Sequence, residues 1–429
     1  MTEEVDSEVS LVADDVKLMR RIQTEKDQAV LQRDLDRLQD WSSNWLLEFN
    51  HTKCKPGILA WLVWDAPAAR DALAKCRWKS PAALLKVVDS VLRGIAQVAF
   101  GNNPLTGLII LVGLFVGNVS SGLGAVVCSL TAIFVAKILN WSDEMVAAGH
   151  SNFNAVLVGS VGTAVFPLVF HTPLTPAIWG YIIVAAVFSV CVMGALAKIL
   201  GGHNIPAFTL PFNIAISTTF MCIRAAGYGE EPPASANITT TTSLQWDQVF
   251  MGTLLSGGHV WAVEDVACSC LVYLGLFIYS PILTLVSYMG ATLGTLTGLL
   301  VSSAPYTLVY HGIWGYNGFL SAGSIAFFMA PTPRVILVAA INAVFATFLQ
   351  SALGPVYAAN KLPVFTFPFC LAAVLFLATA MATGPSSLRV SSLSFPELHL
   401  VEYNQLKNSQ IAPTKEKPDE EDGITQPMV

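Results

Sequence analysis

The chain has 429 residues, of which 54% are hydrophobic and only 12% are charged, with a formal net charge of −6. Soluble globular proteins carry about 25% charged residues, so this composition excludes an ordinary soluble domain and indicates a membrane protein with several spans. The net charge comes mainly from the two polar ends of the chain, and it gives no reason to expect a nucleic-acid partner.

The first 83 residues precede the apolar part of the chain. Residues 1–56 are polar and contain no N-terminal secretory signal. Residues 57–83 are mixed in composition, include Lys75, Arg77 and Lys79, and are expected to lie at the membrane surface. Because membrane proteins retain Lys and Arg on the cytoplasmic side, we predict that the N-terminus is cytoplasmic.

The apolar part extends from about residue 84 to 383 and is divided by a polar insert at 227–248. This insert has no Lys or Arg and holds the sequon Asn237-Ile238-Thr239, so we predict an extracellular loop with Asn237 as a glycosylation candidate. In the first half, apolar segments lie near 104–117, 122–139, 155–170 and 176–200. Several are shorter than the roughly 20 residues that cross a bilayer, which predicts tilted or re-entrant helices. Residues 384–429 are expected to form a disordered cytoplasmic tail.

The two halves of the apolar part repeat one motif. Pro-x-Phe-Thr-x-Pro-Phe occurs at 206–212 and again at 363–369. Gln97 matches His259, Phe153 matches Tyr316 and Thr209 matches Thr366, at offsets of 162, 163 and 157 residues. If the N-terminus is inside and the insert outside, each half crosses the membrane an odd number of times. We therefore predict an all-α polytopic membrane protein built from two inverted repeats, 84–226 and 249–383, of about five helices each.

Longer motifs around these positions resemble the urea transporter family over about residues 84–383. The family signature Leu-Pro-x-x-Thr-x-Pro-Phe is complete at 362–369, and Ile205 replaces its leucine in the first half. The segments 94–107, 153–159 and 312–317 are also similar to the family. The resemblance implies an inverted-repeat fold, a homotrimer in the plasma membrane with one pore in each protomer, and passive flux of urea.

The resemblance also implies which residues line the pathway. A polar residue opens each half and accepts hydrogen bonds from urea, an aromatic and a leucine narrow each half, and the signature threonines lie near the constriction. One further aromatic flanks the first binding position, and its counterpart in the second half is Ala262. The implied pathway residues are Gln97, Phe100, Phe153, Leu157, Thr209, His259, Tyr316, Leu320 and Thr366.

The chemistry of these residues suits a small neutral permeant. Urea offers four N–H donors and one carbonyl acceptor, and backbone carbonyls freed at proline-broken helices could replace its bonds to water, together with the two threonine hydroxyls. On sequence alone these aromatic and polar residues could equally serve helix packing. A channel for water, ammonia or another small neutral amide is the alternative. An integral membrane enzyme is disfavoured because the histidines lack metal-ligand spacing, and we predict no enzyme activity, metal or cofactor.

The N-terminus carries a second resemblance. Residues 11–55, with Ala13-Asp14-Asp15 and the pair Trp41 and Trp45, resemble a fragment of a retroelement reverse transcriptase. The segment lacks the remainder of a polymerase. The resemblance implies that residues 1–56 are an exon fusion or a gene-model error and are dispensable for transport. A captured, functional cytoplasmic tail is the alternative.

Overall fold

The computed structural model describes residues 8–12, 15–19, 62–76, 78, 80–229, 243–379, 388, 390 and 393–411. The chain divides into two compact units, Met1–Gly57 and Ile58–Val429. In the first unit, β1 (Glu8–Val12) and β2 (Asp15–Met19) form an antiparallel pair. The remainder of the segment that resembles a reverse transcriptase lies outside the described residues.

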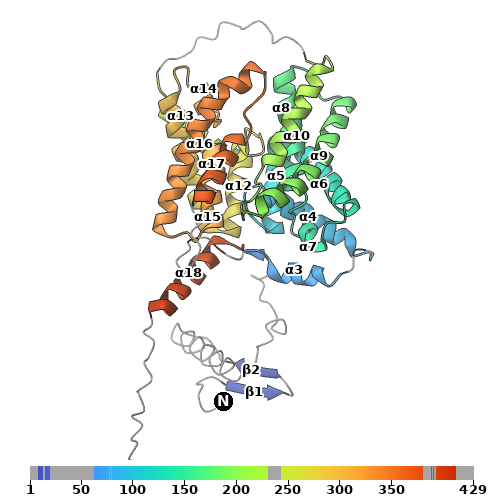
Figure 1. Ribbon diagram of the computed structural model, residues 1–429, viewed down its shortest axis with the longest axis vertical. Coiled ribbons are helices and arrows are strands. Elements are labelled where there is room, and N and C mark those ends of the chain that lie inside the picture. Colours follow the sequence, from blue (N-terminus) through green and yellow to red (C-terminus); the bar gives the residue numbers. More distant parts are fainter. Residues whose placement is uncertain are drawn as a thin grey trace, which may run out of the picture. The chain divides into compact units, whose positions relative to one another are not determined.

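The second unit is helical in its described part, and its helices repeat in order (Figure 1). A short surface helix, α3 (Pro67–Ala74), comes first. The first half follows with α4 (Ala83–Gln97), α5 (Pro104–Gly117), α6 (Val119–Ile138), α7 (Asp143–Ala147), α8 (Phe153–Phe170), α9 (Pro176–Gly201) and α10 (Leu210–Ala225). The second half has α11 (Trp246–His259), α12 (Val266–Tyr279), α13 (Pro281–Val301), α14 (Thr307–Tyr310), α15 (Tyr316–Phe328), α16 (Pro333–Ala359) and α17 (Phe367–Thr379).

Five of these helices are long and apolar enough to cross a membrane, namely α6, α8, α9, α13 and α16. Three more, α5, α12 and α17, are apolar but have fewer than 18 residues. The apolar segments identified near 104–117, 122–139, 155–170 and 176–200 coincide with the helices α5, α6, α8 and α9. In each half a short apolar helix is followed by a long one, α5 by α6 and α12 by α13. The halves differ at the next equivalent pair, since α8 has 18 residues and α15 has 13.

Matching residues begin the equivalent helices. Asn103 and Asp265 accept backbone N–H bonds at the starts of α5 and α12, at 2.7 Å from Leu105 N and from Cys268 N respectively. Thr175 and Thr332 occupy the same capping position before α9 and α16, and a proline follows each. A capping oxygen satisfies a donor that the first turn of a helix leaves unpaired, which is required where water is absent.

The backbone φ angles give separate evidence for the duplication. Positive φ angles occur at paired positions: 67° at Phe100 and 58° at Ala262, 77° at Gly149 and 79° at Gly312, and 50° at Phe208 and 48° at Phe365. Figure 1 also shows α7 at the end of the unit that holds α3 and α4, whereas its counterpart α14 lies at the opposite end. The halves are therefore related by an inversion, as the sequence predicts.

The halves meet along α5 and α12. Thr106 Oγ1 donates a 2.7 Å hydrogen bond to the carbonyl oxygen of Gly275 on the facing helix. A Cβ on Gly275 would lie 3.1 Å from Thr106 O, so the missing side chain permits this close approach. The two backbones approach closely at this point, as small residues allow in membrane helices.

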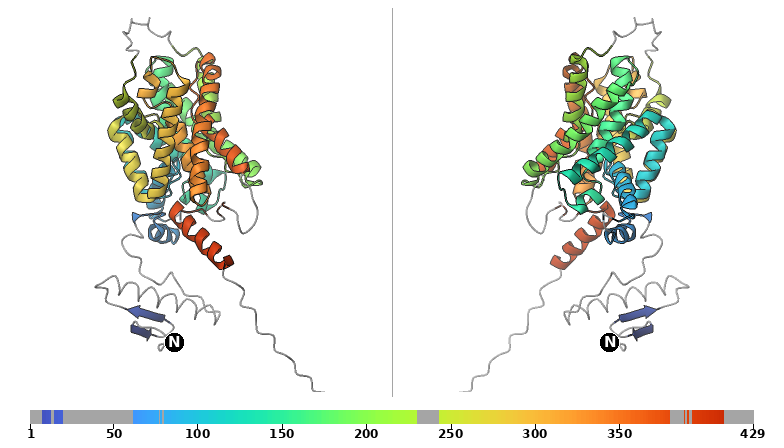
Figure 2. Two further views of the ribbon diagram at one scale, coloured as in Figure 1. Left: turned by 90° about the vertical axis from the view of Figure 1, so that its left-hand side faces the viewer. Right: turned by 90° about the vertical axis from the view of Figure 1, so that its right-hand side faces the viewer.

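The C-terminal segment departs from the expected disordered tail. Residues Pro396–Ile411 form a helix, α18, at the same end of the unit as α3 (Figure 2). Glu397 accepts bonds from Ser280 Oγ (2.7 Å) and Ile282 N (2.8 Å) at the start of α13. Phe395 stacks on Trp64 with ring centroids 5.3 Å apart. A carboxylate at a helix N-terminus is stabilising, so Glu397 fastens α18 to the helical unit. Residues 412–429 lie outside the described part.

Candidate functional site

The two signature threonines meet at the junction of the halves. Thr209 directly precedes α10 and Thr366 directly precedes α17, and both are buried, with 2% and 3% of their surface exposed. Their hydroxyl oxygens lie 2.7 Å apart and share a hydrogen bond. The contact joins residues 157 positions apart, which no local pattern in the sequence could have shown as a contact.

Two more buried side chains complete this contact. Asn213 Nδ2 donates to Thr366 Oγ1 (2.9 Å) and to the backbone oxygen of Thr209 (2.8 Å). Asn213 Oδ1 accepts from the backbone N of Thr366 at 3.1 Å. Cys370 Sγ lies 3.1 Å from Thr209 Oγ1. The centre thus consists of two hydroxyls, an amide and a thiol. Sequence reasoning missed Asn213 and Cys370, although each stands four residues after its threonine.

A pair of equivalent asparagines, Asn154 and Asn317, bonds the non-helical segments that precede α10 and α17. Asn154 Nδ2 donates to Phe208 O (3.3 Å) and its Oδ1 accepts from Phe212 N (3.0 Å). Asn317 bonds Phe365 O (3.2 Å) and Phe369 N (3.4 Å) in the same pattern. Phe208 and Phe365 are the residues with positive φ just before the threonines, a conformation that costs energy for a side chain larger than glycine. The asparagines therefore fix the threonine backbone.

Gln97 and His259 occupy equivalent helix ends. Gln97 is the last residue of α4 and His259 the last residue of α11. Each presents one buried polar atom, Oε1 of Gln97 and Nε2 of His259, that has no hydrogen-bond partner among the described residues. A buried polar atom without a partner is costly and needs a ligand or water to satisfy it. The described hydrogen bonds join neither residue to the threonine pair.

Phe100 belongs to an aromatic cluster between the halves. Its ring contacts Phe208 at 6.4 Å, Phe369 at 6.1 Å, Phe327 at 5.8 Å and Phe328 at 6.3 Å between centroids. Two of these partners belong to the repeated motif and two to the end of α15. No equivalent ring stands at Ala262, so the second half lacks this aromatic side chain at the matching position.

The remaining pathway candidates lie on α8 and α15. Phe153 and Tyr316 are the first residues of these helices and are each 9% exposed, whereas Leu157 and Leu320 are fully buried one turn later. Tyr316 differs from Phe153 by its hydroxyl, which donates a 2.5 Å bond to Phe365 O. This bond ties Tyr316 directly to the second signature motif.

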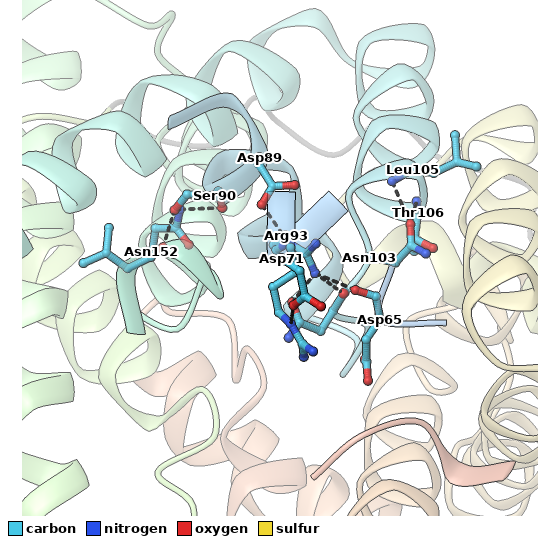
Figure 3. Close-up of polar contacts among 12 residues, drawn as sticks. Asp65, Asp71, Asp89, Ser90, Arg93, Asn103, Leu105, Thr106 and Asn152 are labelled. Atoms are coloured by element: carbon cyan, nitrogen blue, oxygen red, sulfur yellow. Dashed lines mark hydrogen bonds and ion pairs between the residues drawn. The ribbon is translucent and has the colours of Figure 1, made fainter. Parts of the chain in front are cut away.

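A polar network on α4 anchors the loop that follows Gln97 (Figure 3). Arg93 Nε bonds Asp89 Oδ2 at 2.8 Å, and Arg93 Nη1 donates to Asn102 O (2.6 Å) and Asp65 O (3.0 Å). Asn103 Nδ2 donates to Leu62 O at 2.9 Å. The charges of Arg93 and Asp89 are paired, as buried charges must be. The network holds the loop that carries Phe100.

The equivalent loop of the second half is held by different chemistry. Glu264 and Asp265 stand where the first half has Asn102 and Asn103. Asp265 caps α12, and Glu264 pairs with His311. Glu264 and His311 are partly exposed, with 44% and 54% of their side-chain surface accessible. The two ends of the candidate pathway therefore differ in charge.

Among the described residues, the buried Lys, Arg, Asp and Glu side chains are all on α4: Lys86, Asp89 and Arg93. The threonine centre contains only neutral polar groups. An ion entering such a centre would meet no opposite charge and would lose its hydration, whereas a neutral solute loses far less.

Comparison with known proteins agrees with this geometry. Residues 88–381 match the family described as "Urea transporter". The chain belongs to the urea transporter family. It is 32% identical over 333 residues to urea transporter 1 of Ovis aries, covering 75% of this chain and 84% of the relative. It is 29% identical over 385 residues to urea transporter 1 of Mus musculus, covering 87% and 96%. These comparisons give no support to the reverse-transcriptase resemblance of residues 11–55.

Proposed function

We propose that this protein conducts urea passively across a membrane through a narrow pathway within each protomer. Membership of the urea transporter family supports this function, and the observation in the structure that carries it is the pair of threonine hydroxyls 2.7 Å apart at a buried, uncharged junction of the two halves. Hydroxyls both donate and accept, so they can exchange bonds with a solute that offers both N–H and C=O groups.

The pathway runs from Gln97 past the threonine pair to His259. Oε1 of Gln97 and Nε2 of His259, which have no hydrogen-bond partner among the described residues, provide a polar binding position on each side of the centre. Phe100, Phe153 and Tyr316 form aromatic walls that suit a flat molecule, with Leu157 and Leu320 completing them. Each buried polar group of urea left without a hydrogen bond would cost about 1–3 kcal/mol. Hydrogen bonds at these two polar binding positions therefore lower the free-energy barrier to entry.

The direct bond between the threonines implies a step in which they separate. Urea cannot pass between hydroxyl oxygens in contact, so it must exchange their mutual bond for bonds to itself. A neutral hydrogen bond contributes about 0.5–1.5 kcal/mol net, which thermal motion breaks readily. Flux therefore needs no coupled ion or external energy source.

We further propose a homotrimer in the plasma membrane with both termini in the cytoplasm. In this arrangement residues 57–83 lie on the membrane surface, 84–226 and 249–383 are the two repeats, and 227–248 are extracellular. Asn237, the glycosylation candidate in that loop, lies outside the described residues. The Lys and Arg residues before α4 and the lack of them in the insert support this orientation.

The test is uptake of radiolabelled urea into oocytes that express the full chain, beside a water-permeability assay and an ammonium-uptake assay. We expect urea uptake well above that of uninjected oocytes. The uptake should rise with urea concentration without saturating and should not depend on the salt in the medium. Water or ammonia flux without urea flux would refute the proposal and favour the alternative channel. Dependence of urea uptake on a sodium or proton gradient would refute the passive mechanism.

A further inference from the structure

The centre of the pathway is asymmetric at one pair of positions. Asn213 and Cys370 each follow their threonine by four residues and are separated by 157 positions, as Thr209 and Thr366 are. Both are buried, with 4% and 0% of their surface exposed. At equivalent positions, the first half therefore contributes an amide to the centre and the second half a thiol, and the two groups lie 3.7 Å apart.

The amide of Asn213 uses both its donor and its acceptor atoms. Nδ2 donates to Thr209 O at 2.8 Å and to Thr366 Oγ1 at 2.9 Å and lies 3.7 Å from Cys370 Sγ, and Oδ1 accepts from Thr366 N at 3.1 Å. Asn213 thus binds its own half and the opposite half at once. The thiol of Cys370 makes a weaker contact, because sulfur is a poor donor and acceptor.

These contacts favour one direction for the hydroxyl protons. An amide nitrogen can only donate, so Thr366 Oγ1 accepts at its contact with Asn213 and uses one of its two lone pairs there. Either hydroxyl can donate across the 2.7 Å contact between Thr366 and Thr209. Because a hydroxyl that accepts a hydrogen bond is polarised and becomes a better donor, Asn213 favours the arrangement in which Thr366 donates to Thr209. In that arrangement the proton of Thr209 faces the weak acceptor Cys370 Sγ and is the one most easily given up to a better acceptor.

We propose that Asn213 is a positioning residue that orients the two hydroxyls, so that Thr209 donates to the carbonyl oxygen of the permeant. The inference rests on the proposed function, because it assigns a role within the same pathway. Thr209 then selects a permeant with a strong acceptor atom at the constriction. Urea, with a carbonyl oxygen, is favoured over thiourea, whose sulfur accepts weakly.

The test moves the amide from one half to the other. Asn213→Cys removes it, and Asn213→Cys combined with Cys370→Asn restores it at the equivalent position. Urea and thiourea uptake are measured in oocytes and divided by the amount of protein at the surface. Asn213→Cys combined with Cys222→Asn is the matched control, since Cys222 is an exposed residue of α10 and an amide there cannot reach the centre.

We expect Asn213→Cys to lower urea flux at least fivefold and to lower the ratio of urea to thiourea flux. The double exchange should return both to within about twofold of the unaltered protein, and the control should not. Unchanged urea flux in Asn213→Cys, or no recovery in the double exchange, overturns the inference. A structural role in packing alone would not be rescued from the opposite half.

Two further outcomes are distinguished by the same experiment. Lack of urea uptake by the unaltered protein refutes the proposed function itself, whatever the variants do. If Asn213→Cys fails to reach the surface, Asn213→Leu replaces it, because leucine is close to asparagine in size and has neither a hydrogen-bond donor nor an acceptor. Normal urea flux in Asn213→Leu would then overturn the inference.

Discussion

Replacing each threonine of the central pair by valine separates the roles of the two hydroxyls. Valine keeps the shape of threonine and removes its oxygen. Thr366→Val removes the bond to Thr209 and leaves one N–H of Asn213 with only Cys370 Sγ, a weak acceptor 3.7 Å away. Thr209→Val removes the bonds to Thr366 and Cys370, but the Thr366 hydroxyl keeps its bond from Asn213 and its proton is free to rotate.

The contacts give the expected magnitudes. Loss of the acceptor at the constriction should raise the barrier to urea by about 1–2 kcal/mol in either variant, or roughly 5–30-fold in flux. An orphaned buried donor costs about 1–3 kcal/mol of stability, so Thr366→Val should unfold at a lower temperature than Thr209→Val. The double variant should lose less than the sum of the two, because both singles break one shared bond.

The assays are urea flux per molecule at the cell surface and thermal unfolding of the purified protein in detergent. Thr→Ser at either position keeps the hydroxyl and should keep the flux. Thr292→Val is the matched control, because Thr292 bonds only Tyr288 O in its own helix. Normal flux in both central valine variants would refute the pathway argument and leave the threonines with a structural role.

Four other changes test separate parts of the reasoning. Gly159→Ala would place a Cβ 1.9 Å from Gly124 O, whereas Gly180→Ala meets nothing within 4 Å, so only the first should reduce surface expression and unfolding temperature. His259→Gln supplies the same amide as Gln97 and should keep urea flux within about threefold, and His259→Leu should lose most of it, as uptake assays would show. Burial raises the pKa of Asp65, which precedes α3, above its ordinary value of 3.8. The folded protein then binds the Asp65 proton more tightly than the unfolded chain does. The free energy of unfolding therefore falls as pH rises from about 3.8 through the raised pKa. Asp65→Asn should flatten this dependence in thermal unfolding measured between pH 4 and 8. Deleting residues 1–56 should leave surface-normalised urea flux within about twofold, and a larger loss would give this segment a role in transport.

Local patterns made the helices and the duplication predictable from sequence. Apolar runs and prolines at helix starts depend on residues close together in the chain, and the repeated Pro-x-Phe-Thr-x-Pro-Phe exposed the second half as a copy of the first. The candidate site was found in the same way, since Thr209 and Thr366 are marked by identical neighbours. Their direct contact is a consequence of how the halves meet, and the sequence holds no local signal for it.

The parts that sequence reasoning missed depend on contacts between distant segments. Asn213 is an ordinary polar residue in a helix until Thr366, 153 positions away, is placed beside it. Helix α18 has a polar, unremarkable composition, and its place is set by Glu397 at the start of α13 and by Phe395 on Trp64. A pattern of charge within 384–429 cannot reveal a capping bond that spans 117 residues.

The duplicated halves also differ in which central carbonyl can serve a permeant. Phe365 O accepts from Tyr316 Oη at 2.5 Å and from Asn317 Nδ2 at 3.2 Å, and these two bonds occupy both of its lone pairs. Phe208 O accepts only from Asn154 Nδ2 at 3.3 Å among the described contacts, because Phe153 has no hydroxyl where Tyr316 has one. One lone pair therefore remains on the side of the first repeat, where Thr209 also has its proton to donate. On the proposed pathway, a solute with adjacent C=O and N–H groups can use both at once, so the asymmetry of the centre favours a permeant of the urea class.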